Sequence, residues 1–106
     1  MPEDRWSASE KKIARRVFEE ALATELAQTI AEFKARAAAI TTPDDLWPLE
    51  DFLRRRRYEI DSRYDYRYSR LRLVFGLLLR EGRISEDALA RLSEDKLAAI
   101  RRVAGL

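Results

Sequence analysis

The strongest constraint on this fold is a helical pattern that continues without a breaker from Ser7 to Ile40. Ser7 and Glu10 have the spacing of a capping box, in which the serine caps a backbone N–H and the glutamate reaches back. Apolar residues then recur at helical spacing: Ile13, Val17, Phe18, Leu22, Leu26, Ile30, Phe33, Ala37 and Ile40. A helix of about 33 residues would be about 50 Å long, which is more than a small globule needs. We therefore expect its stripe to be buried against a returning helix and a second subunit.

A second helix is predicted from the segment Thr42-Pro43-Asp44-Asp45. It combines an N-cap threonine, a proline suited to the first turn and acids at the positive end of the helix dipole. Two starts are open, and we favour a helix from Pro43 that is distorted at Pro48 over a short turn with the helix proper beginning at Pro48. The expected apolar stripe consists of Leu46, Leu49, Leu53, Ile60 and Tyr64, and Arg57 falls within it.

The helical periodicity continues through the tyrosine-rich segment to a stop at Glu81-Gly82. We expect a bend between Asp61 and Tyr64, because a domain of this size does not carry one straight helix over that length. The residues that extend the stripe are Tyr68, Leu71, Phe75, Leu78 and Leu79. The spacing of Tyr64 and Tyr68 favours core packing over stacking against nucleic-acid bases.

Two short helices are predicted to complete the chain. Ser85 and Ser93 each precede a Glu-Asp pair, so each has the pattern of an N-cap. The predicted fold is all-α, a single helical domain over residues 1–106. A long helical hairpin at 7–62 forms a dimeric stem, and residues 63–106 form a helical head.

The composition excludes several kinds of active site. The sequence contains no cysteine and no histidine, so a disulfide, a thiolate metal site and an imidazole base have no residues to form them. The acidic pairs Asp44-Asp45 and Glu50-Asp51 are adjacent, and their side chains diverge on a helix. We therefore expect a protein that is not an enzyme and that uses no cofactor and no metal.

The most basic run, Arg54 to Arg57, does not predict a nucleic-acid surface. Successive helical residues are rotated by about 100°, so four consecutive arginines surround the helix instead of forming one stripe. Acidic residues lie on both sides of the run, and the net charge is only +2. No apolar stretch approaches the roughly 20 residues of a membrane span, and the N-terminal region carries charges. We expect a cytoplasmic protein that binds neither nucleic acid nor a membrane interior.

The centre of the chain carries a specific pattern: DDLW-x-L-x-DFL from Asp44, R-x-EID from Arg57 and YDYRYS from Tyr64. With Trp6-Ser7 near the start and DK-x-x-x-I from Asp95, it resembles the cyanobacterial fluorescence recovery protein family. The resemblance implies a small, all-helical homodimer. It also implies a partner, the photoactivated orange carotenoid protein, whose return from the red to the orange form the family accelerates.

The resemblance points to four residues for partner binding and the dimer interface: Trp47, Glu50, Asp51 and Arg57. Trp47 and Asp51 correspond to the family's binding surface, although a tryptophan in this pattern could also belong to the core. Arg57 corresponds to a position where dimer contacts and partner binding meet. An arginine in an apolar stripe either extends its charge to solvent or pairs with an acid. Asp61 on the same helix, or Asp51 or Glu50 of a second protomer, could supply that acid.

The chain departs from well-known family members at four positions. Glu50 replaces a histidine, Pro48 stands where they have no proline, and Leu73 and Ala99 replace an aromatic residue and a lysine associated with partner binding. Two main hypotheses follow: a regulator of the orange carotenoid protein, or a similar helical dimer that serves a different protein partner. A small nucleic-acid-binding dimer is a third hypothesis, which the arrangement of charges disfavours.

Overall fold

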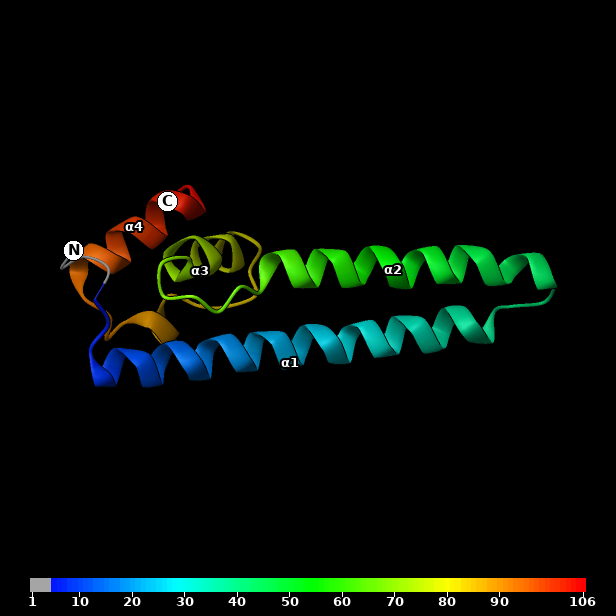
Figure 1. Ribbon diagram of the computed structural model, residues 1–106, viewed down its shortest axis with the longest axis horizontal. Helices are drawn as coiled ribbons and strands as arrows, with labels where there is room; N and C mark the ends of the chain where they lie inside the picture. The colour runs from blue at the N-terminus through cyan, green and yellow to red at the C-terminus, as the bar shows by residue number, and fades with distance from the viewer. Residues whose placement is uncertain (1–4) are drawn as a thin grey trace.

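The computed structural model describes residues 5–106, and every regular element within that range is a helix (Figure 1). Helix α1 (Ala8–Ala38) runs the length of the molecule, and α2 (Leu46–Arg63) returns beside it to form a stem. Helices α3 (Leu71–Arg80) and α4 (Glu94–Ala104) form a head at the end where α1 begins, with a 3₁₀ turn at Asp87–Leu89 between them. The all-α prediction is confirmed. Within the described range, no helix is both long enough and apolar enough to span a bilayer.

Helix α1 follows the prediction from its sequence closely. It contains 31 residues, and the capping box at its start is present. The hydroxyl of Ser7 accepts a hydrogen bond from the Glu10 N–H at 3.1 Å, and the Glu10 carboxylate accepts one from the Ser7 N–H at 3.0 Å.

The start of α2 lies between the two alternatives that the sequence left open. A separate 3₁₀ turn, Pro43–Asp45, precedes a helix that begins at Leu46. The Asp45 carboxylate accepts hydrogen bonds from the N–H groups of Thr41 and Thr42, at 2.9 and 3.1 Å, and closes the turn. Pro48 therefore occupies the first turn of α2, where an N–H has no partner within the helix.

The expected bent helix from α2 into α3 is wrong, because the chain leaves helical conformation altogether over residues 64–70. The reason lies in the spacing of three tyrosines at every second position. A helix would point Tyr66 away from Tyr64 and Tyr68, whereas the irregular backbone of this segment lets all three side chains reach the head. All three pack against the head core, and the Phe18 ring lies 5.4 Å from Tyr64 and 4.8 Å from Tyr66 between centroids.

The head core is built from both ends of the chain. Its fully buried large side chains are Phe75, Leu71, Leu78, Leu89 and Ile100. Trp6, Val17 and Phe18 join the same cluster, so the first half of α1 belongs to the head. The predicted division into a stem at 7–62 and a head at 63–106 does not include this contribution of α1 to the head core.

Helices α3 and α4 approach each other closely at Gly76. A β-carbon at this position would lie 2.4 Å from the Cβ of Val103, so no other residue fits without displacing α4. The predicted cap at Ser93 is present, since its hydroxyl accepts the Lys96 N–H at 3.4 Å. The short helix predicted after Ser85 is wrong, since only the 3₁₀ turn Asp87–Leu89 forms there, although the Ser85 hydroxyl accepts the Ala88 N–H at 3.3 Å.

Candidate functional site

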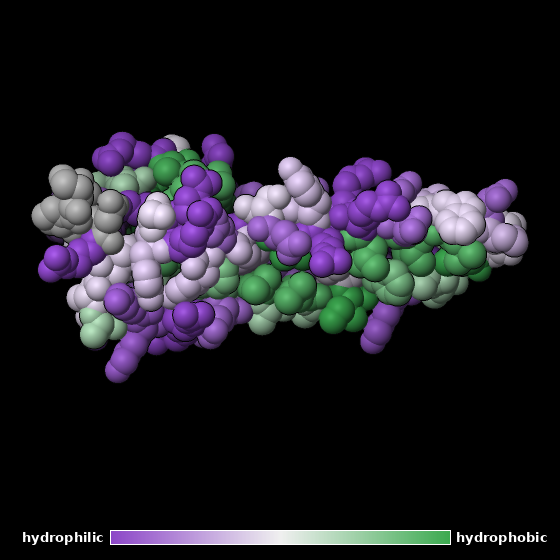
Figure 2. Space-filling view, in the orientation of Figure 1, coloured by the Kyte–Doolittle hydropathy of each residue, from purple (hydrophilic) through white to green (hydrophobic). Residues whose placement is uncertain are grey.

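The stem presents an exposed apolar surface along one side (Figure 2). On α2, Leu49 is half-buried and Ile60 is buried, but Leu46 and Leu53 remain 45% and 44% exposed. The stripe expected from the sequence is therefore divided between two sides of the helix. Leu26 and Ile30 of α1 are also exposed, at 43% and 56%. We call these four residues, Leu26, Ile30, Leu46 and Leu53, the apolar face.

The four predicted site residues all lie on α2 with exposed side chains. Trp47 is 61% exposed, so it is not part of the core. Glu50 and Asp51 flank Arg54, whose guanidinium lies 3.3 Å from the Glu50 carboxylate and 3.7 Å from that of Asp51. Trp47, Glu50 and Asp51 thus form one exposed cluster within a turn of each other near the tip of the stem, with Arg54 partly balancing its negative charge.

Arg57 lies farther along the helix from this cluster. It stands ten residues after Trp47, which corresponds to about 15 Å of helix. Its guanidinium is 3.6 Å from the Asp61 carboxylate, and both side chains are largely exposed. Arg57 follows Leu53 by one helical turn, so it borders the apolar face. Among the acids that the sequence offers as partners for Arg57, Asp61 is the one that lies near it within the protomer.

Sequence reasoning missed a polar cluster where the stem joins the head. The buried carboxylate of Glu25, on α1, accepts hydrogen bonds from the Arg63 guanidinium at 2.6 Å and the Tyr64 hydroxyl at 2.9 Å. Arg83, beyond α3, lies 3.4 Å from the same carboxylate. One side chain therefore connects α1, the end of α2 and the loop after α3. The sequence does contain a signal for this cluster: Glu25 stands eight residues after Val17 and so lies on the side of α1 that faces the core.

The electrostatics of this cluster favour an ionised Glu25. Burial alone would raise the pKa of this carboxyl. The hydrogen bonds from Arg63 and Tyr64 and the charges of Arg63 and Arg83 outweigh burial, so the pKa lies below its ordinary value of 4.5. For Tyr64, burial and the neighbouring carboxylate raise the pKa of the hydroxyl, which keeps it protonated as a donor.

A second buried ion pair joins the start of α1 to α4. The Glu10 carboxylate accepts the Ser93 N–H at 2.8 Å and lies 3.2 Å from the Lys96 ammonium. Lys96 also donates to the backbone carbonyl of Arg5 at 2.8 Å. The lysine and isoleucine of the DK-x-x-x-I pattern are thus structural, because Ile100 lies in the head core.

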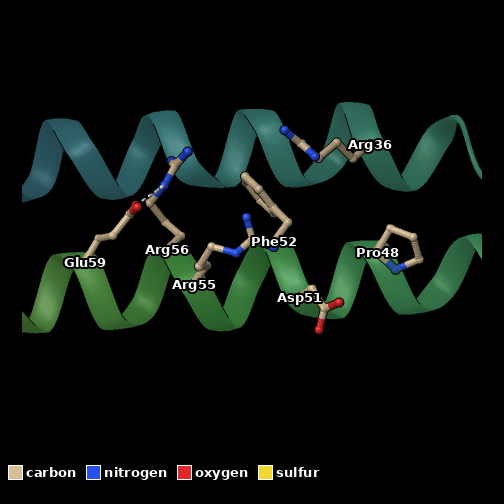
Figure 3. Close-up of a pocket in the computed structure, with 7 residues that line it drawn as sticks. All are labelled: Arg36, Pro48, Asp51, Phe52, Arg55, Arg56 and Glu59. Atoms are coloured by element: carbon tan, nitrogen blue, oxygen red, sulfur yellow. Dashed lines mark ion pairs between the residues drawn. The ribbon is translucent and has the colours of Figure 1, made fainter.

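The stem also contains a cleft of about 420 Å³ between α1 and α2 (Figure 3). Its seven lining residues are Arg36, Pro48, Asp51, Phe52, Arg55, Arg56 and Glu59, and we call this the stem cleft. Only Asp51 among the predicted site residues lines it. Pro48, one of the positions where the chain departs from the family pattern, forms part of its wall.

Comparison with known proteins gives consistent matches over nearly the whole chain. The family model for a photoprotection regulator, fluorescence recovery protein, matches residues 6–104. The fluorescence recovery protein of Synechocystis is 42% identical over 101 residues, which cover 95% of this chain and 93% of that protein. The solved structure of the Fremyella diplosiphon protein superimposes with a TM-score of 0.91 at 35% identity. That of the Synechocystis protein does so with a TM-score of 0.90 at 41% identity. Both alignments cover 96% of this chain and 100% of the other.

Proposed function

The chain belongs to the fluorescence recovery protein family, and we propose that it is a dimeric, non-catalytic regulator of the orange carotenoid protein in the cytoplasm. In this role it binds the photoactivated red form and accelerates its relaxation to the orange form. The proposal rests on membership of this family, which is one of photoprotection regulators.

The observation that carries the proposal is the exposed cluster of Trp47, Glu50 and Asp51 within the pattern that the family shares. A tryptophan that is 61% exposed on a helix leaves a large apolar area in contact with water. Tryptophan beside charged groups is a common centre of protein interfaces. The cluster has the composition expected of a surface that binds another protein.

The shape of the protomer supports the dimer. The radius of gyration is 17.0 Å, whereas a compact domain of this length has about 13 Å. The longest dimension is 57 Å and the other two are 25 and 22 Å. In such a slender hairpin neither helix can cover the apolar face, so a second copy across a two-fold axis is the simplest way to bury it.

Acceleration of the relaxation requires no covalent chemistry from this chain. A binder lowers the barrier of a conformational change when it contacts the transition state more strongly than the starting state. The sequence has no histidine or cysteine to act as an acid, a base or a nucleophile. Preferential binding to a partly closed carotenoid protein is sufficient.

The direct test is a measurement of recovery kinetics. Orange carotenoid protein is converted to its red form by light, and its absorbance is then followed in the dark with increasing amounts of this protein. We expect the recovery rate to rise with added protein until it saturates. An unchanged rate at large excess would favour the alternative, in which the helical dimer serves a different protein partner.

A variant pair ties this activity to the exposed cluster. Trp47→Ala should reduce the acceleration at subsaturating concentration, because it removes the largest apolar contact of the cluster. Leu106→Ala is the control, since Leu106 is similarly exposed, at 72%, but lies at the C-terminus. Equal activity of both variants and the unchanged protein would place the binding surface elsewhere.

A further inference from the structure

The stem cleft lies on the side of the stem opposite the apolar face. On α2, Arg55 follows Leu53 by two positions, which corresponds to about 200° of rotation around the helix. A dimer that buries Leu53 therefore leaves Arg55 in solvent. Figure 3 shows the Phe52 ring extending from α2 towards α1, with the Arg36 side chain along α1 and the Arg55 side chain along α2, and all three residues line the cleft.

The charges that line the cleft do not balance each other. Arg56 is engaged with two acids, since it lies 3.1 Å from the Glu32 carboxylate and 3.6 Å from that of Glu59. The carboxylate of Asp51 is drawn outward to Arg54, which is not a cleft residue.

The other two arginines that line the cleft are Arg36 and Arg55. Within residues 5–106, neither has a carboxylate partner. The cleft is thus left with two cations that are not neutralised.

Phe52 holds one of these cations in place. The Arg36 guanidinium lies 4.2 Å from the centroid of the Phe52 ring, and the Arg56 guanidinium lies 5.0 Å from it. Such cation–π contacts restrict the guanidinium orientation without using its hydrogen-bond donors. Arg36 therefore keeps its N–H groups available for an incoming acceptor, and fewer rotamers must be lost on binding.

We propose that the stem cleft is a docking site for an acidic side chain of the protein partner, with Arg36 and Arg55 as the hydrogen-bond donors and Phe52 as the apolar floor. A carboxylate accepts two parallel N–H bonds from one guanidinium, and such charge-assisted bonds are stronger than neutral ones. The inference rests on the proposed function, because the partner tested is the photoactivated orange carotenoid protein.

A protein carboxylate fits this cleft better than a nucleic-acid backbone does. Asp51 and Glu59 line the same cleft, and their two negative charges oppose a run of phosphates more strongly than one carboxylate. A single carboxylate adds one negative charge to a cleft whose Arg36 and Arg55 have no carboxylate partner within residues 5–106. The cleft is open enough for one or two side chains, at about 420 Å³.

The test measures binding of photoactivated orange carotenoid protein to four versions of this chain. Arg55→Gln removes the charge and most donors, and Arg55→Lys keeps the charge without the planar guanidinium. Arg91→Glu is a stringent control for overall charge, because it lowers the net charge by two units where Arg55→Gln lowers it by one. Arg55 and Arg91 are both exposed, and within the described part of the chain neither forms an ion pair, so these variants should fold normally. Thermal unfolding and the dimer mass verify this.

We expect Arg55→Gln to weaken the complex about ten-fold and Arg55→Lys to fall between it and the unchanged protein. Arg91→Glu should stay within about two-fold, because long-range effects of one surface charge are largely screened at physiological salt. Raising the salt concentration should weaken the unchanged complex more than the Arg55→Gln complex.

Three results would overturn the inference. If Arg55→Gln binds like the unchanged protein, the cleft is not the docking site, while the proposed function stands. If Arg91→Glu weakens binding as much as Arg55→Gln, general charge and not the cleft is responsible. If the unchanged protein does not bind the carotenoid protein at all, the proposed function fails, and the assignment of the cleft to that partner fails with it.

Discussion

The head and the stem are both made of packed helices, yet they bury their side chains to very different degrees. The large side chains of the head core, such as Phe75 and Leu78, are completely buried. In the stem, by contrast, Thr29 is the only buried residue in the range 26–59. The head can therefore be stabilised by its own core, whereas two helices in contact along a single line leave most of their surface in water. This difference supports the proposal that a second protein surface covers the stem.

The largest expected effect is on the head. Phe75→Ala should lower the free energy of unfolding by about 3–5 kcal/mol, because it opens a cavity in a close-packed core. Phe52→Ala, in the half-buried position on the stem, should cost less than half as much, since its ring is already partly hydrated. Chemical denaturation followed by circular dichroism compares the two. Equal losses would show that the stem is as well packed as the head.

The next effect tests the apolar face of the stem. Leu53→Glu should convert the proposed dimer to a monomer at tens of micromolar, because an unpaired carboxylate would be buried in the proposed interface at a cost of roughly 3 kcal/mol. Light scattering reports the mass, and the near-ultraviolet circular dichroism of Trp6 and the tyrosines reports whether the head stays folded.

Tyr58→Glu is the matched control for this change. Tyr58 is 75% exposed and lies about 140° around α2 from Leu53. The control should remain dimeric. A monomer for both variants, or a dimer for both, would contradict the assignment of the apolar face to the dimer.

The connection between the two regions depends on Glu25. Glu25→Gln should destabilise the protomer by about 2 kcal/mol, because the charge-assisted bonds from Arg63 and Tyr64 become weaker. Glu19→Gln is the control, since that exposed carboxylate on the same helix forms only a surface ion pair with Arg15.

The Glu25→Gln substitution should also change the pH dependence of the stability. The folded-state pKa of Glu25 is lowered, so its contribution is present above the ordinary value of 4.5 and is lost as the pH falls through the folded value. Unfolding midpoints measured from pH 7 downward should therefore fall less steeply in Glu25→Gln. Parallel curves for the variant and the unchanged protein would show that Glu25 is not the group responsible.

The smallest effect concerns Arg57. Its ion pair with Asp61 is exposed, so Arg57→Ala should change the stability of the protomer by less than about 1 kcal/mol. The dimer should respond more, with a dissociation constant raised about ten-fold, because Arg57 borders the apolar face one turn after Leu53. Arg54→Ala on the outer side of α2 is the control. An unchanged dissociation constant would show that Arg57 lies outside the interface between protomers.

The elements with local causes could be predicted from the sequence. The capping box of Ser7 and Glu10, the stop at Gly82 and the cap at Ser93 depend on residues within one turn of each other, and all three are present. The positions of Trp47, Glu50 and Asp51 within one turn of α2 followed from helical spacing alone. The exposure of Trp47 did not, because the same spacing would suit a core residue.

Only the tertiary structure decided which side of α2 meets α1. Leu53 and Phe52 are neighbours in the sequence and differ by about 100° on the helix, so an apolar pattern alone does not choose between them. Phe52 faces α1 and carries the cation–π contacts with Arg36 and Arg56.

The sequence by itself determined the all-α class, the capped starts of α1 and α4 and the family, because these depend on local spacing and on a long specific pattern. The tertiary structure decided the break over residues 64–70, the pairing of Glu25 with Arg63 and Tyr64, and the unbalanced arginines of the stem cleft. The partners in that pairing are separated by 38 and 39 residues. No local rule specifies such contacts, because they form only when packing of the head against α1 brings distant side chains together.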